Sequence, residues 1–127
     1  EMVAIMGPSG SGKSTLLYNV AGMDQPTGGQ VWLGDTELTK LSEDEKARLR
    51  LRRMGFVFQQ MNMMANLNIL DNILLPASQT GRSRDRKSKE ERNLRARALM
   101  EKLGISGLGE RKISQVSGGQ LQRACIC

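Results

Sequence analysis

The stretch that decides the fold is "GPSGSGKST", Gly7–Thr15, which directly follows the apolar run "MVAIM" at 2–6. It fits the pattern G-x-x-x-x-G-K-[ST], in which glycines let backbone N–H groups turn toward one point without side chains in the way. The helix expected after the loop aims the positive end of its dipole at that point. A flexible Gly/Ser-rich turn is the alternative, but the strand and helix expected on either side favour a phosphate-binding loop.

The pattern gives two side chains of the loop a specific role. Lys13 can reach the β- and γ-phosphates of a nucleoside triphosphate, and the Ser14 hydroxyl can ligate Mg²⁺. The loop alone does not separate kinases, GTPases, helicases and transport ATPases, which all use it. The residues predicted to bind the nucleotide are Gly7, Pro8, Ser9, Gly10, Ser11, Gly12, Lys13, Ser14 and Thr15.

The composition is that of a small globular domain. The chain has 127 residues, of which 39% are hydrophobic and 25% charged. No apolar run approaches the roughly 20 residues of a membrane span, and the first residues lack the pattern of a signal peptide. Any membrane association is therefore expected to come through a partner.

The net charge of +6 is concentrated in one segment. Between Arg82 and Arg97 there are eight Lys or Arg residues and three acidic ones. Such a cluster can bind nucleic acid or form the solvated face of a helix. Aromatic residues make up only 3% of the chain, so stacking platforms for bases are absent and the solvated face is favoured.

The spacing of apolar residues and the positions of glycine and proline predict alternating strands and helices. The apolar runs 2–6 and 54–58 are expected to be buried parallel strands, and 30–34 a further strand. Ser42 and Glu45 form a capping-box pattern at the start of a helix. Helices are expected at 13–22, closed by Gly22; at 41–53; at 68–76, closed by Pro76; at 90–103, closed by Gly104; and from 117 onward, with a polar loop at 80–88.

Cys125 and Cys127 lie two residues apart near the end of the sequence. At that spacing two helical side chains point to different faces, so a bridge between them is not expected. The chain has no histidine to complete a metal site. Two small buried side chains in a reducing compartment is the preferred interpretation.

A second motif, "VSGGQLQR" at 116–123, resembles the signature sequence of ABC-type ATPases, usually written LSGGQ. Val116 replaces the commoner leucine, and Ser117, Gly118, Gly119 and Gln120 match. A serine hydroxyl and glycine N–H groups at a helix start make a second phosphate receptor. An ordinary helix cap is the alternative for this segment taken alone.

Order and spacing extend the resemblance to the whole chain. After the phosphate loop, "GFVFQQ" supplies the glutamine of the Q-loop, and Gln59 is the match. The chain resembles the ATP-binding subunit of ABC transporters, of the macrolide-export, lipoprotein-release and antimicrobial-peptide-export type. The resemblance implies an α/β fold: a P-loop NTPase core with parallel strands and an ABC-type antiparallel sheet at 1–60, and a helical subdomain with the signature at 61–127.

The resemblance also implies a function. ATP and Mg²⁺ would bind at the loop, with Ser14 and Gln59 at the metal and Gln59 positioning the attacking water. Ser117–Gln120 would contact the ATP of a second, head-to-tail subunit, and hydrolysis would power a transmembrane permease at the cytoplasmic face of the membrane. The family's Walker B aspartate, catalytic glutamate and switch histidine are expected beyond Cys127, so this stretch alone is expected to be inactive.

Three alternatives remain: a soluble ABC-type ATPase acting in DNA repair or translation, a small kinase, and a binding module without catalysis. The uninterrupted stretch from Gln59 to Ser117 favours transport, and "SGGQ" disfavours a kinase. The methionines after Gln59 fit two roles equally: core filling or an adaptable interface with the permease. They are Met61, Met63 and Met64.

Overall fold

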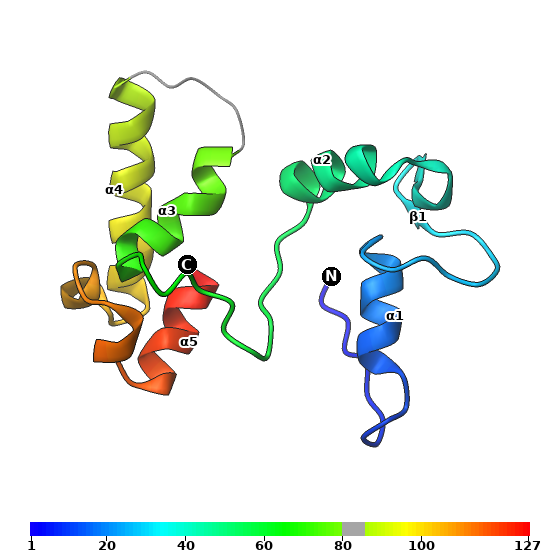
Figure 1. Cartoon of the computed structure of the whole chain (residues 1–127), viewed down its shortest axis with the longest axis horizontal. Helices are drawn as coiled ribbons and strands as arrows, with labels where there is room; N and C mark the ends of the chain where they lie inside the picture. Colours follow the sequence, from blue (N-terminus) through cyan, green and yellow to red (C-terminus); the bar gives the residue numbers. More distant parts are fainter. Residues whose placement is uncertain (80–85) are drawn as a thin grey trace. The chain divides into compact units, whose positions relative to one another are not determined.

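A computed structural model of the chain describes residues 1–79 and 86–127, with side chains at 1–79 and 88–127. The chain divides into two compact units, 1–55 and 56–127, which are described separately (Figure 1). The basic cluster that starts at Arg82 therefore lies partly outside the described residues.

The first unit contains the helices and the hairpin that follow the glycine-rich loop. Strands β1 and β2 pair antiparallel, with Trp32 opposite Glu37 and Leu33 opposite Thr36. Gly34 occupies the connection at a φ of 57°, a left-handed conformation that glycine adopts without strain. The elements are α1 (Lys13–Val20), β1 (Trp32–Leu33), β2 (Thr36–Glu37), the 3₁₀ turn η1 (Leu38–Lys40) and α2 (Glu43–Arg53).

The start of α2 confirms the capping box. The Ser42 hydroxyl accepts a hydrogen bond from the Glu45 N–H at 3.4 Å, and the Ser42 N–H donates to Glu45 Oε2 at 2.9 Å. These bonds satisfy two backbone donors that a helix start would otherwise leave free. The Ser42 N–H, and then its hydroxyl, hold the pKa of Glu45 below its usual value.

The core of the first unit is small, and α2 contributes a lysine stem to it. Ala21 and Leu38 are buried, and Lys46 is only 5% exposed. Its ammonium reaches Glu43 Oε1 at 2.7 Å, and this hydrogen bond lowers the pKa of Glu43. Arg50 donates to the carbonyl of Gly22, which joins α2 to the end of α1. The fold around α1 is therefore held by side chains of α2.

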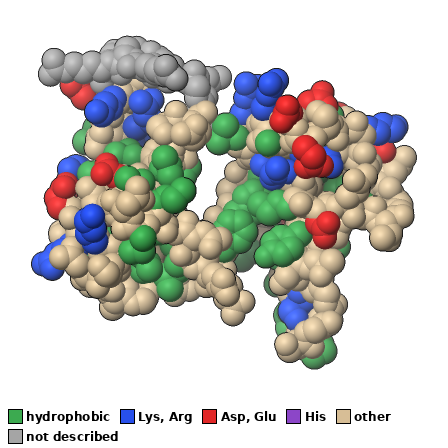
Figure 2. Space-filling view, viewed as in Figure 1, with side chains coloured by type: hydrophobic (Ala, Val, Ile, Leu, Met, Phe, Trp, Pro, Cys, Tyr) green, Lys and Arg blue, Asp and Glu red, His purple; other side chains and the backbone are tan. Residues whose placement is uncertain are grey.

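The two apolar runs expected to be buried parallel strands differ from that prediction. Residues 2–6 and 54–58 are not in strands, and β1–β2 is the only sheet within the described parts of the chain. Met2 and Met6 are 98% and 87% exposed. A strand needs a hydrogen-bonded neighbour, and one buried on both faces also needs covering layers, which neither run has here. Hydrophobic side chains consequently show on the surface of both units (Figure 2).

The second unit is helical. α3 packs against α4 and α5, with the longest helix, α4, shown in yellow (Figure 1). Its core is formed by Ile69, Leu70, Ala96, Met100, Ile105 and Ala124. The elements are α3 (Ile69–Gln79), α4 (Arg86–Lys102), the 3₁₀ turns η2 (Ser106–Leu108) and η3 (Ile113–Gln115), and α5 (Gly118–Ile126).

Two helix boundaries differ from the sequence-based expectation. The prediction that Pro76 ends the helix is wrong, because α3 continues through Pro76 to Gln79. Proline removes one helical N–H donor but leaves its own φ helical, so the helix can continue past it. α4 begins at Arg86, so the end of the expected polar loop at 86–88 is helical. The rest of that loop lies outside the described residues.

The two cysteines lie at the end of α5. Both are free thiols, and both are half-buried where two buried side chains were predicted. Partial burial raises the pKa of Cys125 and of Cys127, because a thiolate is poorly solvated there. None of the helices in the described residues is both long and apolar enough to cross a bilayer.

Candidate phosphate-binding sites

The glycine-rich loop is shaped by glycines in conformations that other residues avoid. Gly10 and Gly12 have φ values of 80° and 83°, in the left-handed region. The Ser11 N–H donates to the Pro8 carbonyl at 3.3 Å, which closes the turn. A Cβ at Gly7 would stand 2.7 Å from Ser11 Oγ, so a larger residue there would displace that side chain. The loop is therefore a defined turn, and its backbone shape depends on Gly10 and Gly12.

Lys13 folds back over the loop that precedes it. Its ammonium donates to the Gly7 carbonyl at 2.9 Å, to the Pro8 carbonyl at 2.6 Å and to Ser11 Oγ at 3.3 Å. An ammonium has three donors, and all three are used. The positive charge of Lys13 is thereby held beside Gly7, Pro8 and Ser11 of the loop.

The start of α1 leaves its backbone donors uncapped by any side chain. The N-cap residue is Gly12, and the first helical bond runs from the Leu16 N–H to the Gly12 carbonyl at 2.8 Å. In the described residues no acceptor is recorded for the N–H groups of Lys13, Ser14 and Thr15. Three such donors, the helix dipole and a nearby ammonium suit an anion with several oxygens. The predicted phosphate-binding chemistry is available here.

The signature segment forms the start of α5 in a different way. The Ser117 hydroxyl accepts from the Gln120 N–H at 3.3 Å, and Gln120 Oε1 accepts from the Ser117 N–H at 2.9 Å. These two bonds make a complete capping box. They leave the Ser117 hydroxyl proton and the N–H groups of Gly118 and Gly119 available to an external acceptor. The segment is both a helix cap and a potential anion site.

Arg123 stabilises this segment by hydrogen bonds. No role was predicted for Arg123 from the sequence alone. Its guanidinium donates to the Gly119 carbonyl at 3.3 Å and to the Leu103 carbonyl, at the end of α4, also at 3.3 Å. The spacing of four residues between Gly119 and Arg123 was the available signal, because such residues share a helix face.

Gln59 lies in the second unit, at a bend after the exposed run 56–58. Its side chain is exposed, and it shares that unit with the signature segment. The structure thus joins the predicted residues in two groups: Gly7, Pro8, Ser11 and Lys13 by hydrogen bonds in the loop, and Ser117 with Gln120 at α5. The assignment of Gln59 and Ser14 to Mg²⁺ stays a prediction.

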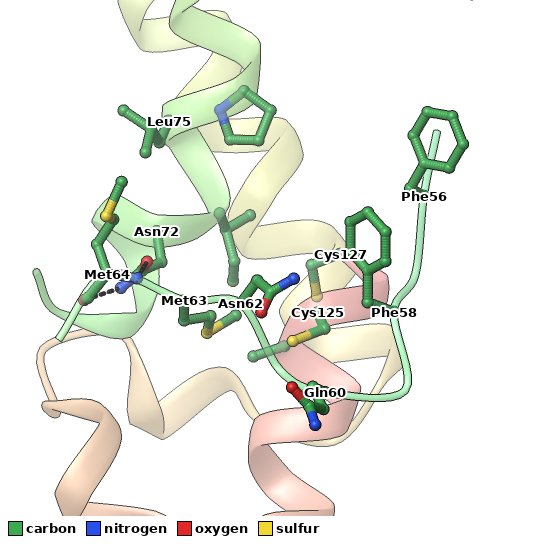
Figure 3. A pocket seen from close by; sticks show the side chains of 13 residues that line it. Phe56, Phe58, Gln60, Asn62, Met63, Met64, Asn72, Leu75, Cys125 and Cys127 are labelled. Atoms are coloured by element: carbon green, nitrogen blue, oxygen red, sulfur yellow. Dashed lines mark hydrogen bonds between the residues drawn. The ribbon is translucent and has the colours of Figure 1, made fainter. Parts of the chain in front are cut away.

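The segment after Gln59 forms one wall of a cavity of about 240 Å³ in the second unit (Figure 3). Aromatic, aliphatic, sulfur-containing and amide side chains line it, and the rings of Phe56 and Phe58 stack with centroids 5.9 Å apart. Asn72 in α3 also lines it, and no sequence pattern singled that residue out. The lining includes Phe56, Phe58, Met63, Met64, Cys125 and Cys127.

Comparisons with curated proteins place these two motifs in a known context. The chain is 42% identical over 126 residues to the macrolide export ATP-binding/permease protein MacB of Rhodopseudomonas palustris, covering 99% of this chain and 18% of that protein. It is 40% identical to the lipoprotein-releasing system ATP-binding protein LolD 1 of Chlorobium chlorochromatii, covering 99% of this chain and 50% of that protein. The chain thus spans at most about half of these relatives.

Solved structures agree with the sequence relatives. The dimeric structure of MJ0796, a bacterial ABC transporter cassette, matches with a TM-score of 0.86 and 39% identity over 95% of this chain and 52% of that chain. A post-hydrolysis state of the same cassette bound to ADP and Pi matches equally well. This likeness confirms the expected α/β cassette fold. Because the family model described as ABC transporter also matches residues 1–127, the chain belongs to the ABC transporter family.

Proposed function

We propose that this chain binds ATP with Mg²⁺ at Gly7–Thr15 and that the intact protein hydrolyses it to power a membrane permease. The observation that carries the proposal is the loop itself, where the Lys13 ammonium and three uncapped N–H groups gather at one helix start. The relatives are named for macrolide export and lipoprotein release, which favours transport over DNA repair or translation.

Lys13, Ser14, Gln59 and the backbone of the loop have separate chemical tasks in this proposal. Lys13 compensates the charge of the β- and γ-phosphates, and the backbone N–H groups of the loop and of α1 donate to their oxygens. The Ser14 hydroxyl and the Gln59 amide oxygen would hold Mg²⁺, and Gln59 would orient the attacking water. Residues 1–60 serve as the nucleotide-binding core and 61–127 as the subdomain that carries the signature.

The signature segment would act on the ATP of a second subunit. Ser117–Gln120 keeps a hydroxyl proton and two N–H groups available, and one bound nucleotide does not need two such cradles. A head-to-tail pair would place ATP between the loop of one subunit and the signature of the other. The dimeric structure of the related cassette supports this pairing. The permease would hold the dimer at the cytoplasmic face of the membrane.

The test compares Lys13→Ala with Lys102→Ala in the intact protein. Removing Lys13 leaves phosphate charge uncompensated, and charge-assisted hydrogen bonds contribute about 1.5–3 kcal/mol each. We expect titration calorimetry with MgATP to show no measurable binding for Lys13→Ala. Lys102 is an exposed lysine of α4, so its loss should leave the affinity unchanged. Equal ATP affinity of Lys13→Ala and the unmodified protein would contradict the proposal.

A further inference from the structure

Asn72 holds the segment that follows Gln59 by its side-chain amide. Asn72 Oδ1 accepts from the Met64 N–H at 2.7 Å, and Nδ2 donates to the Met64 carbonyl at 3.1 Å (Figure 3). Nδ2 also donates to the Asn68 carbonyl at 2.9 Å, so both amide hydrogens are used. The residue is 8% exposed. The Asn72 amide bonds to both the N–H and the carbonyl of Met64. It therefore pairs with that residue in the way that the backbone of a neighbouring strand would.

Other hydrogen bonds within this segment are local turns. The Met63 N–H donates to the Met61 carbonyl at 3.0 Å, and the Leu67 N–H donates to the Met64 carbonyl at 3.1 Å. Neither bond links Met61–Met64 to a helix. Asn72 does so, because it belongs to α3, whose residues Ile69 and Leu70 are part of the core. Met63 packs against that core, and Asn72 supplies the hydrogen bonds that attach the segment to α3.

We propose that Asn72 is a positioning residue that fixes the segment 59–64 and, through it, the direction of the Gln59 side chain. This inference rests on the proposed role of Gln59 in holding Mg²⁺ and the attacking water. A group that orients a reacting water must be held within fractions of an ångström, and misplacement by about 1 Å costs up to a hundredfold in rate. Gln59 itself is exposed on a bend, so its direction depends on how the following residues are held.

Met63 and Met64 offer a local readout of this attachment. Both line the cavity beside Asn72, whereas Met100 is 1% exposed in the core of the same unit. Methyl NMR of the intact protein labelled at methionine can therefore separate a loosened segment from a damaged fold. In Asn72→Leu we expect the Met64 and Met63 methyl signals to shift and sharpen, and the Met100 signal to stay in place.

The kinetic readout separates positioning from nucleotide binding. In Asn72→Leu we expect kcat for ATP hydrolysis to fall about tenfold to a hundredfold, with ATP affinity at the Lys13 loop within about twofold of the unmodified protein. Asn62→Leu is the matched control, because Asn62 lines the same cavity, is exposed and has no hydrogen bond recorded in the described residues. It should change neither the Met64 signal nor kcat.

A second variant covers the case in which Asn72→Leu fails to fold. Asn72→Asp keeps the size of the side chain and the acceptor for the Met64 N–H, but it loses both donors and faces two carbonyl oxygens with a carboxylate. It should show the same loosened Met64 signal and the same fall in kcat.

Three results would overturn the proposal: unchanged Met64 signals in both folded variants, an equal effect from Asn62→Leu, or a loosened segment with normal kcat. The role of Gln59 is tested separately by Gln59→Ala. If Gln59→Ala keeps full activity while Asn72→Leu still displaces Met64, the role of Gln59 fails and the attachment by Asn72 stands.

Discussion

The two candidate phosphate-binding sites both lie at helix starts, but they differ in whether a side chain caps the first backbone N–H groups. At α1 the N-cap is glycine, so no side chain caps the helix, and a lysine completes the site. At α5 the serine and glutamine of the motif cap the helix themselves and leave only part of the first turn free. The first site includes an ammonium, whereas the free donors of the second are neutral, because the Arg123 guanidinium there is bonded to the Gly119 and Leu103 carbonyls.

This difference indicates a division of labour. A site with an ammonium and three free N–H groups can bind a polyphosphate without help. A neutral site whose helix is already stable can add contacts to an anion that is held elsewhere, without needing the anion for its own folding. The loop should therefore determine affinity for nucleotide, and the signature should determine what happens after binding. The following predictions test that contrast.

The largest effect is expected from Gly119→Asp. A Cβ at Gly119 would meet no heavy atom within 4 Å among the described residues, apart from its own helix backbone, so the carboxylate fits the single subunit. It also favours the helix start electrostatically. Against a phosphate, however, it is repulsive. We expect normal ATP binding, but complete loss of ATP-dependent dimerisation on size exclusion, using intact protein and a non-hydrolysable analogue.

Gly107→Asp is the control for this variant, because that position is equally open and carries the same added charge away from the signature. It should dimerise normally. A Gly119→Asp protein that still forms the ATP-dependent dimer would show that the signature does not contact nucleotide.

A smaller effect is expected at Gly12. Its φ of 83° costs an alanine about 1–2 kcal/mol, which corresponds to about five- to thirtyfold in an equilibrium constant. Gly12→Ala should weaken ATP binding by about that factor in calorimetry, because the loop must distort. Gly28→Ala is the matched control, since a Cβ at Gly28 would meet open space and the backbone there is not in the left-handed region. Unchanged affinity in Gly12→Ala would mean that the loop tolerates another shape.

Ser117→Ala should act mainly on the helix that carries the signature. Loss of an N-cap serine costs about 1 kcal/mol, within a range of about 0.5–2 kcal/mol. Urea unfolding of the intact protein should show that loss, as it should for Ser42→Ala at the start of α2. The two variants differ in function: only Ser117→Ala should slow ATP turnover. Equal turnover in both would reduce the signature serine to a helix cap.

The smallest effect concerns pH and separates the two capping boxes. The pKa of Glu45 is lowered in the folded chain, so its contribution to stability is present above the unfolded pKa of about 4.3 and is lost as pH falls through the folded value. Gln120 does not titrate. As the pH falls from 7 through the folded pKa of Glu45, the NMR signal of the Ser42 amide should therefore move and that of the Ser117 amide should not. Glu45→Gln should abolish the movement at Ser42.

Local patterns in the sequence predicted the helix starts well. Ser42 with Glu45 predicted a capping box, and the structure contains it, because both partners lie within one turn and depend on nothing distant. The glycine pattern predicted a loop followed by a helix, and the structure contains both, for the same reason. The glycine loop and the signature at 116–123 also carry the resemblance to the family.

Features that depend on distant parts of the chain were predicted poorly. The runs 2–6 and 54–58 have the composition of buried strands, but strand formation requires partners that composition does not reveal. The bonds from Asn72 to Met64 join residues eight apart through one rotamer, and nothing in "NILDNILLP" distinguishes that asparagine from its neighbour Asn68. The contacts of Arg123 could be predicted only in part. Its hydrogen bond to the Gly119 carbonyl follows from helical spacing, whereas its hydrogen bond to the Leu103 carbonyl does not.

The three hydrogen bonds of Lys13 have a thermodynamic consequence. Any phosphate that binds the ammonium must replace the carbonyls of Gly7 and Pro8 and the hydroxyl of Ser11. Nucleotide capture at this loop is then an exchange of partners. Its measured enthalpy is the difference between two sets of bonds, and its association rate includes the time the ammonium takes to leave the first set.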